Sequence, residues 1–380
     1  MRLSIGNVAE GEDYFARTYL DEKFWRMLKN SKHISIVAPR RVGKTCFIVN
    51  VSKTEKDGFT IIYTITESIY NSNDFFKKIY TEILNVVGKS KKLSELFADL
   101  IKKNGIHKIG LDGIEFSKND LNFFDEIKLF LKKNTDLNIV ILIDEFSQTL
   151  ENIILSKGEN EAKLFLHQCR ELRLDPNCKD KINFVYTGSV GLENLVASID
   201  ELKSINDITV FEVPQLRTDE GLQLIDQILD NEDYDFDILC KNYLLEKIKW
   251  QLPFYIQLIM SEIQEICIEN KNKIVNNAII DTAFTKSLSR RTYFEHWETR
   301  LKKVFKGTDY KFVKAFLDFV AENDTISKFE GLNIAQKHII SSNKPMINVL
   351  LHDGYIVQTE DSSYRFASPL VQQWWIKNCL

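Results

Sequence analysis

The sequence lacks the features that define several large classes of protein. Its six cysteines are scattered without C-x-x-C spacing, so neither a zinc site nor a disulfide framework is predicted. No run approaches the ~18 consecutive apolar residues of a membrane span, and the first residues lack the apolar stretch of a signal peptide. We therefore expect a cytoplasmic protein with reduced, mostly structural cysteines.

A strong excess of charge is also absent. Lysine and arginine number 50 against 54 aspartate and glutamate residues, which gives a net charge of −4. The chain has no overall excess of basic residues that would predict binding to nucleic acid, so contact with DNA would need a local basic patch. The hydrophobic content of 44% is that of a globular protein. A chain of 380 residues is longer than a domain with a single hydrophobic core usually is, so we expect two or three domains.

The most informative segment is APRRVGKT at 38–45, which follows the apolar run 34–37. It matches the phosphate-binding pattern G-x-x-x-x-G-K-[ST], except that Ala38 replaces the first glycine. In such a loop the backbone N–H groups surround the β-phosphate, Lys44 reaches the β- and γ-oxygens, and the Thr45 hydroxyl binds Mg²⁺. The alternative is a helix entry that happens to contain Gly-Lys-Thr. The candidate nucleotide-binding residues here are Ala38, Pro39, Arg40, Arg41, Val42, Gly43, Lys44, Thr45 and Cys46.

A second motif supplies the acidic partner that a phosphate loop requires. The apolar run 139–143 ends in Asp144 and Glu145. Asp144 at the end of a strand is predicted to hold Mg²⁺ together with Thr45, and Glu145 to orient the attacking water. The alternative is an acidic pair at the N-terminus of a helix. Lys44 separately supports phosphate binding at the loop. A cation at the positive end of a helix dipole is unfavourable unless an anion, such as a polyphosphate, binds there.

Hydrophobic patterning predicts an α/β fold. Five candidate strands, at 34–37, 59–64, 139–143, 184–187 and 208–211, alternate with helical patterns that include 13–30, 75–87 and 119–133. Strands separated by helices indicate a parallel sheet that is covered on both faces. In the helix at 13–30, Tyr19, Phe24, Trp25 and Leu28 form the predicted apolar stripe. Between 93 and 118 the pattern weakens, apart from a small hairpin predicted at 106–116.

The remainder of the chain is predicted to form two further parts. Helical periodicity dominates from 218 to 305 and indicates a helical lid. Helices at 310–322, 330–341 and 344–354, followed by strands at 355–358 and 364–367, predict a winged helix-turn-helix; the alternative is a generic α+β cap. We therefore expect a leader at 1–30, a nucleotide-binding core at 31–217, a lid at 218–306 and a winged helix at 307–380. Trp374 and Trp375 indicate a packed final helix or a partner surface.

Several polar residues keep two interpretations. Ser189 follows the strand at 184–187 and would sense the γ-phosphate, or would simply form a turn. Arg170 and Arg173 share a helix face. They would either act on a neighbouring subunit or form salt bridges within the chain, and we favour the salt bridges. Arg40 and Arg41 are either phosphate clamps or surface charges. The histidines at 107, 167, 296, 338 and 352 lack metal-ligand spacing and are expected in core or surface roles.

These motifs, together with YTGSVGL at 186–192 and WQLPF at 250–254, resemble the archaeal-type P-loop ATPases of prokaryotes, in the STAND and AAA+ related group. The leader at 14–17 is similar to their Phe-x-Gly-Arg box, with alanine in place of glycine. The resemblance implies an ASCE-type core of five parallel strands in which Lys44, Thr45, Asp144 and Glu145 have the usual roles. It also places Ser189 near the first sensor position, Phe15 and Arg17 close to the adenine, and Pro253 in a lid helix that approaches the nucleotide.

The predicted function is that of an Mg²⁺-dependent ATP-binding switch whose catalytic residues are Glu145, Lys44 and Ser189. ATP is favoured because no guanine-specifying N/TKxD element is present. A protein partner or self-assembly is expected. One alternative is a DNA-binding regulator, but 307–380 holds seven basic against eight acidic residues, which disfavours phosphate-backbone contact. The other alternative is a scaffold that senses nucleotide without hydrolysing it.

Overall fold

The structure, a computed structural model, describes residues 1–30, 33–89, 106–110, 113–116, 121–134, 137–188, 191–230 and 232–380. The chain forms two compact units. The sheet unit comprises Arg17–Val37 and Phe47–Glu212, and the helical unit comprises Met1–Ala16, Ala38–Cys46 and Val213–Leu380. The segment with the predicted phosphate loop therefore interrupts the sheet unit and groups with the helical unit.

The sheet unit is built on five parallel strands. These are β1 (Ile34–Val37), β2 (Thr60–Ile65), β5 (Ile139–Asp144), β6 (Ile182–Tyr186) and β7 (Thr209–Glu212), in the order β2-β5-β6-β1-β7. Each predicted strand is confirmed to within two residues. β5 and β6 are buried throughout because helices cover both faces of the sheet. The α/β fold predicted from the sequence is confirmed.

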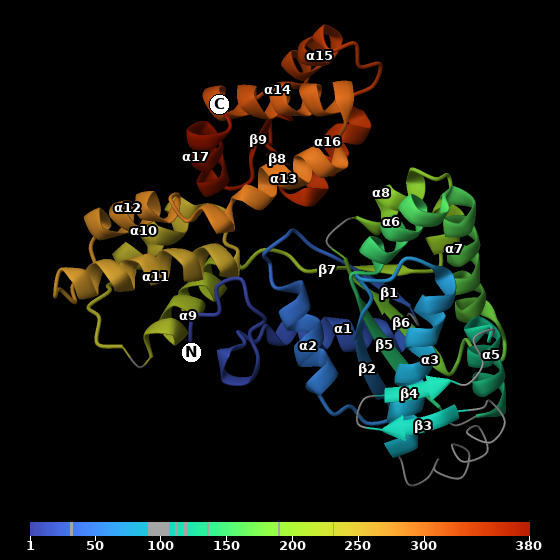
Figure 1. Cartoon of the computed structure of the whole chain (residues 1–380). Helices are drawn as coiled ribbons and strands as arrows, with labels where there is room; N and C mark the ends of the chain where they lie inside the picture. Colours follow the sequence, from blue (N-terminus) through green and yellow to red (C-terminus); the bar gives the residue numbers. More distant parts are fainter. Residues whose placement is uncertain are drawn as a thin grey trace. The chain divides into compact units, whose positions relative to one another are not determined.

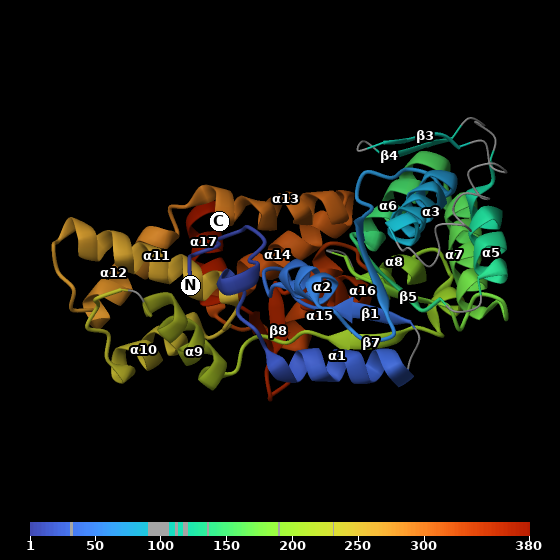
Figure 2. The ribbon, with the colours of Figure 1, turned by 90° about the horizontal axis from the view of Figure 1, so that it is seen from below.

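Helices form a layer on each face of this sheet (Figures 1 and 2). Alternate residues of β5, among them Ile141 and Ile143, join a buried cluster with the helices of one layer. On the other face Phe24 packs edge-on against Phe47 and Phe211, with ring centroids 5.5 and 5.6 Å away. The first layer contains α3 (Ser72–Lys89), α5 (Phe123–Lys133), α6 (Phe146–Lys157), α7 (Glu159–Leu174) and α8 (Leu192–Ala197). The second contains α1 (Thr18–Asn30) and the body of α2 (Lys44–Lys53).

The first helix differs from the prediction. It begins at Thr18 rather than at Asp13, because 11–13 form the short 3₁₀ turn η1 (Gly11–Asp13), whose Gly11 has a φ of +58°. Tyr19 was also wrongly placed in the apolar stripe and is exposed. Leu20 takes that place, since it is spaced by four from Phe24, and residues at this spacing share a helix face.

The predicted hairpin is confirmed as β3 (Ile106–Gly110) paired antiparallel with β4 (Gly113–Phe116). Of the predicted turn at 112–113, Gly113 is the first residue of β4, whereas 111, 112 and the weakly patterned stretch from 93 to 105 lie outside the described residues. A second 3₁₀ turn, η2 (Leu202–Ile205), precedes β7.

The helical unit continues from the end of β7. Its first part contains α9 (Thr218–Leu229), α10 (Ile238–Ile248), α11 (Pro253–Glu269), α12 (Asn277–Ser287), the 3₁₀ turn η3 (Arg291–Tyr293) and α13 (Glu295–Val304). α9, α10 and α12 all contact α11, which is the most buried of these helices. None of the helices in the described part of the chain has the length and hydrophobicity that a membrane crossing requires.

The C-terminal elements follow the predicted order. They are α14 (Gly307–Asn323), α15 (Lys328–Lys337), α16 (Lys344–Asp353), the antiparallel strands β8 (Ile356–Gln358) and β9 (Tyr364–Phe366), and α17 (Pro369–Asn378). This is the element order of a winged helix-turn-helix. α17 packs on α14, and both Trp374 and Trp375 are buried, so the packed final helix is confirmed.

Candidate nucleotide site

Asp144 is held at the carboxyl end of β5 by donors from both neighbouring strands. The Thr187 hydroxyl, just after β6, donates to Oδ1 of Asp144, and the Tyr63 hydroxyl on β2 donates to Oδ2 at 3.3 Å. The Glu145 N–H also donates to Oδ1, at 3.1 Å. With 4% of its surface exposed, Asp144 is a buried carboxylate oriented by three hydrogen bonds.

The backbone of Asp144 is fixed as firmly as its side chain. Thr66, after β2, donates to the Asp144 carbonyl through its N–H at 3.1 Å and through its hydroxyl at 3.2 Å. The Thr149 hydroxyl of α6 in turn donates to the Thr66 carbonyl at 2.6 Å. Tyr63, Thr66 and Thr187 were not predicted as site residues, because their only signal in the sequence is a polar residue at or near the end of an apolar strand.

Glu145 occupies the first position of the turn into α6. Its backbone is left-handed (φ 59°, ψ 33°), a conformation that costs a residue other than glycine about 1–2 kcal/mol. Its side chain makes no capping hydrogen bond to α6, although Glu145 is the N-cap residue. The simple helix-capping alternative therefore does not account for Glu145, and strain of this kind is typical of functional positions.

The phosphate-loop segment has the predicted context of strand, loop and helix. Ala38 follows β1 directly, and α2 begins at Lys44. The Lys44 ammonium donates to the Ala38 carbonyl at 3.1 Å, which closes the loop on itself. Arg41 and Gly43 have positive φ, at 68° and 96°, whereas Ala38 does not. Position 38 therefore makes no conformational demand for glycine, and the departure from the pattern is accommodated.

The two loop arginines are half-buried among residues of the helical unit. The Arg41 guanidinium lies 4.4 Å from the centre of the Phe254 ring, a cation–π contact. Arg40 lies close enough to Arg300 and Asp353 for their charges to act on it. Burial lowers the pKa of both loop arginines, and the charge of Arg300 lowers that of Arg40 further. In this structure neither arginine is a simple surface charge.

The remaining predicted nucleotide contacts are dispersed over both units. Cys46 accepts a hydrogen bond from the Ala9 N–H at 3.4 Å, and burial raises the pKa of its thiol. Phe15 is buried in the helical unit. Arg17, buried in the sheet unit, donates to the Tyr19 hydroxyl at 2.6 Å. Pro253 is the first residue of α11, Pro39 and Val42 lie within the loop, and Ser189 lies outside the described residues.

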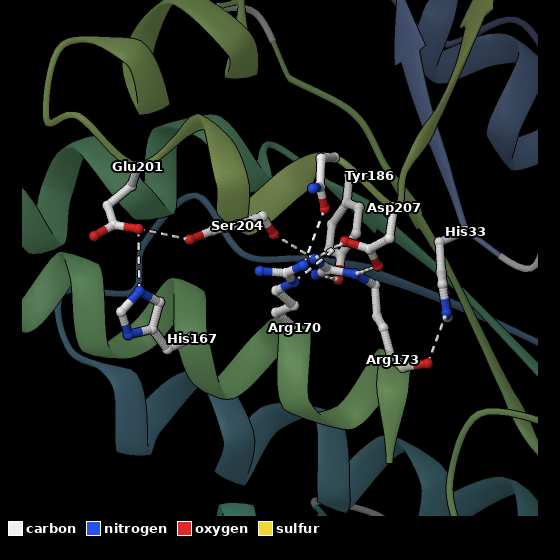
Figure 3. A network of polar contacts seen from close by, with 9 residues as sticks. His33, His167, Arg170, Arg173, Tyr186, Glu201, Ser204 and Asp207 are labelled. Atoms are coloured by element: carbon white, nitrogen blue, oxygen red, sulfur yellow. Dashed lines mark hydrogen bonds and ion pairs between the residues drawn. The ribbon is translucent and has the colours of Figure 1, made fainter. Parts of the chain in front are cut away.

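Arg173 is the centre of a buried polar network in the sheet unit (Figure 3). Its Nε donates to Asp207 at 2.6 Å, and its other nitrogens reach the Ser204 carbonyl, the Tyr186 hydroxyl and the second Asp207 oxygen. Although burial raises the pKa of Asp207, the bonds from Arg173 hold it below its ordinary value. Arg170 on the same helix donates to Asn206 at 3.1 Å. Both arginines lie within ion-pair distance of Asp207, which agrees with the salt-bridge interpretation of this pair.

His33, a buried histidine that no sequence motif marks, supports the same network. His33, 5% exposed, accepts the Phe184 N–H at Nδ1 and donates from Nε2 to the Arg173 carbonyl, at 3.2 and 3.3 Å. Because one ring nitrogen accepts while the other donates, the imidazole is neutral. His167 pairs with Glu201 at 3.0 Å at the edge of the network.

The sheet topology places the carboxyl ends of three strands along one edge of the sheet. β5, β6 and β1 are consecutive and parallel, so their carboxyl ends share that edge. Asp144 and Thr187 lie at two of these ends, and the third leads into the phosphate loop. The hydroxyl of Thr45 and the carboxylate of Asp144 are each hard oxygen donors of the kind that Mg²⁺ prefers, so each residue by its chemistry fits this metal.

No protein-family model and no curated protein matches the sequence. Solved structures are similar: a Walker-type ATPase of Pyrococcus abyssi has a TM-score of 0.62 at 14% identity, covering 96% of this chain and 97% of that chain. The ORC2 protein of Aeropyrum pernix, solved in ADPNP and ADP complexes, has a TM-score of 0.54 at 11% identity, with 94% and 91% covered. At such low identity the likeness establishes the fold, which is that of P-loop ATPases.

Proposed function

We propose that this chain is an ATP-binding molecular switch that hydrolyses ATP slowly and in an Mg²⁺-dependent manner. The observation that carries the proposal is Asp144, a buried carboxylate oriented from both neighbouring strands at the sheet edge where β1 leads into the phosphate loop. A carboxylate buried in this way needs a cationic ligand or strong hydrogen bonds. Both are expected at the end of a strand in a P-loop ATPase.

Each residue of the proposed site has a distinct task. The loop N–H groups and Lys44 bind the phosphates, and Thr45 and Asp144 hold the metal. When bound, Mg²⁺ would supply positive charge that offsets the charge of the phosphates. Glu145 would accept a proton from the attacking water, and Ser189 would contact the γ-phosphate. Phe15, Arg17 and Pro253 are proposed near the base.

The proposed output is a movement of the C-terminal half. In this scheme 1–30 is a leader, 31–217 the nucleotide-binding core, 218–306 a lid and 307–380 a winged helix, and nucleotide state changes how the last two pack. Protein contact is favoured over DNA contact at the winged helix. Its near-neutral charge and the exposed Phe329, Leu332 and Ile339 support this choice. A gel-shift titration against salt, expected to show no steep salt dependence, tests it.

Equilibrium ATP binding tests the proposed site. Wild-type protein is expected to bind ATP with Mg²⁺, and Lys44→Ala to lose measurable binding because the principal phosphate cation is removed. Lys53→Ala, at the other end of α2, is the matched control and should bind like wild type. Equal binding by wild type and Lys44→Ala would show that the nucleotide, if bound, does not occupy this loop.

A further inference from the structure

Helix α15 packs against α14 through its smallest residues (Figure 1). Gly331 and Ala335, which lie about one turn apart, are the buried residues of α15. A Cβ at Gly331 would lie 3.0 Å from the ring of Phe316 on α14, so the two helices approach closely. Burial of large apolar side chains stabilises a helix most, yet α15 buries its small ones.

The large apolar residues of this segment are instead exposed. Phe329 is 72% exposed, Leu332 50%, and Ile339, two residues after the helix, 91%. Together with the exposed Gln336 they form the outer face of α15. These four positions are spaced by three, four and three residues, which is the spacing of the contacts that one helix makes along another. In the described part of the chain this outer face stays uncovered.

Ile339 is held on the outer face by a backbone that does not suit it. The amides of Ile339 and Ile340 donate to the carbonyls of Gln336 and Ala335 at 3.0 and 2.9 Å, as in the Schellman motif that ends many helices. The motif needs a left-handed residue, usually glycine, and here Ile339 has a φ of +58°. Among the described residues it is the one β-branched residue with a positive φ. A strained and exposed isoleucine adds little to the packing of its own chain, which indicates an external contact.

The charge beside the outer face is positive. Lys328 and Lys337, both exposed, lie on opposite flanks of this face by helical geometry. No ion pair joins either lysine to an acidic residue in the described part of the chain. The one acidic residue of α15, Glu330, is occupied in capping, since it accepts from the Ser327 N–H and hydroxyl at 2.8 and 2.7 Å. The outer face is therefore apolar along its middle and positive at its flanks.

We infer that the outer face of α15 is the docking site for an acidic amphipathic helix of a partner protein. The apolar side of that helix packs on Phe329, Leu332 and Ile339, whose spacing suits a helix. Its carboxylates lie beside Lys328 and Lys337, where their charge is complementary. This inference rests on the protein contact in the proposed function, and it specifies the surface used and the chemistry of the partner.

Fluorescence anisotropy with two synthetic peptides tests the inference. Both peptides span about three heptads with leucine at the a and d positions. The polar side of one carries glutamate and glutamine, and that of the other carries lysine and glutamine. The full chain should bind the acidic peptide at least about tenfold more tightly than the basic one. Equal affinities, or displacement of the acidic peptide by duplex DNA, would overturn the inference. Because the titration contains no nucleotide, its failure is distinct from a failure to bind ATP.

Substitutions show whether the acidic peptide occupies the outer face. Phe329→Ala should weaken its binding at least about tenfold, since a central aromatic contact is lost. Leu239→Ala, which truncates a similarly exposed apolar residue on α10, is the matched control and should bind like wild type. Unchanged affinity in Phe329→Ala would place the peptide elsewhere and contradict the inference. A wild-type dimer on a sizing column that Phe329→Ala abolishes would make a second copy the occupant, and would also overturn it.

Ile339→Gly separates a role in binding from a role in the fold. Glycine adopts the left-handed backbone without strain, so the urea midpoint of unfolding should rise. The affinity for the acidic peptide should fall at least about fivefold, because an apolar contact is removed. A lower urea midpoint, or an unchanged affinity, would show that Ile339 does not serve the partner contact.

Discussion

The hydroxyl of Thr187 donates a hydrogen bond to the buried carboxylate of Asp144 across the β5–β6 pair. The register of these parallel strands produces the contact, because Ile143 pairs with Tyr186 and the following residues then lie side by side. Asp144 is thereby oriented by a neighbouring strand as well as by the Glu145 N–H of its own turn.

Replacing Thr187 with valine preserves the shape of the side chain and removes the donor. A hydrogen bond to a charged group contributes about 1.5–3 kcal/mol, so we expect the rate of ATP hydrolysis to fall by at least about tenfold. Thr64→Val is the matched control, since Thr64 is a buried threonine of the same unit whose hydroxyl has no hydrogen-bond partner. Equal rates in the two variants would show that Thr187 does not orient Asp144.

The Arg173 network should govern the stability of the sheet unit. Arg173→Leu removes both hydrogen bonds to the mostly buried Asp207 carboxylate and leaves it only the longer contact with Arg170 at 4.0 Å, and such a loss typically destabilises by about 3 kcal/mol or more. Arg170→Ala removes a more exposed cation and should change stability by less than about 1 kcal/mol. Urea unfolding measures both. A loss for Arg173→Leu no larger than that for Arg170→Ala would contradict the assigned role.

His296 should make the protein less stable in mild acid. Its pKa is about 3 in the folded state against an ordinary value of 6.5, so between these pH values the unfolded chain binds the extra proton. Stability therefore rises with pH across this window and levels off above 6.5, with a slope of up to about 1.4 kcal/mol per pH unit.

His296→Phe keeps an aromatic ring and removes the titrating group, so the loss of unfolding free energy from pH 7 to pH 4 should be smaller than in wild type. The comparison isolates His296 because the carboxylates that titrate in the same range are present in both proteins. Parallel pH profiles for the two proteins would refute this prediction.

Gly354 should tolerate no side chain. Its φ of +81° and the nearby Trp250 indole make Gly354→Ala both strained and crowded, so we expect a loss of at least about 2 kcal/mol in unfolding free energy. Gly58→Ala is the matched control, with a φ of +79° and nothing within 4 Å of the added Cβ. It should lose only about 1 kcal/mol, for the strain alone. Equal losses would mean that Trp250 yields without penalty.

Much of the fold could be predicted because its signals are local. The apolar runs of β1 and β5, the Gly-Lys-Thr that opens α2, and the proline at the start of α11 mark their elements within a few residues. The start of α1 was misplaced because a short 3₁₀ turn at 11–13 continues the helical pattern without forming an α-helix.

The contacts that orient the site could not be predicted in the same way. Thr187 meets Asp144 only through the register of two strands, and Arg41 meets Phe254 only because the phosphate-loop segment packs with the helical unit. No motif or hydrophobic period around His33 indicates that this histidine is buried and hydrogen-bonded. Such pairings depend on tertiary packing, and a single sequence does not encode them in any local pattern.

Single-turnover hydrolysis of ATP with Mg²⁺, in wild type and Glu145→Gln, tests directly whether this chain hydrolyses ATP through Glu145. Glu145 is proposed to accept the proton of the attacking water, so Gln at this position should slow hydrolysis by at least about 100-fold. ATP binding should persist in this variant, because the loop and Lys44 are intact. Hydrolysis at the wild-type rate by Glu145→Gln, or no hydrolysis by ATP-saturated wild type, would contradict the account.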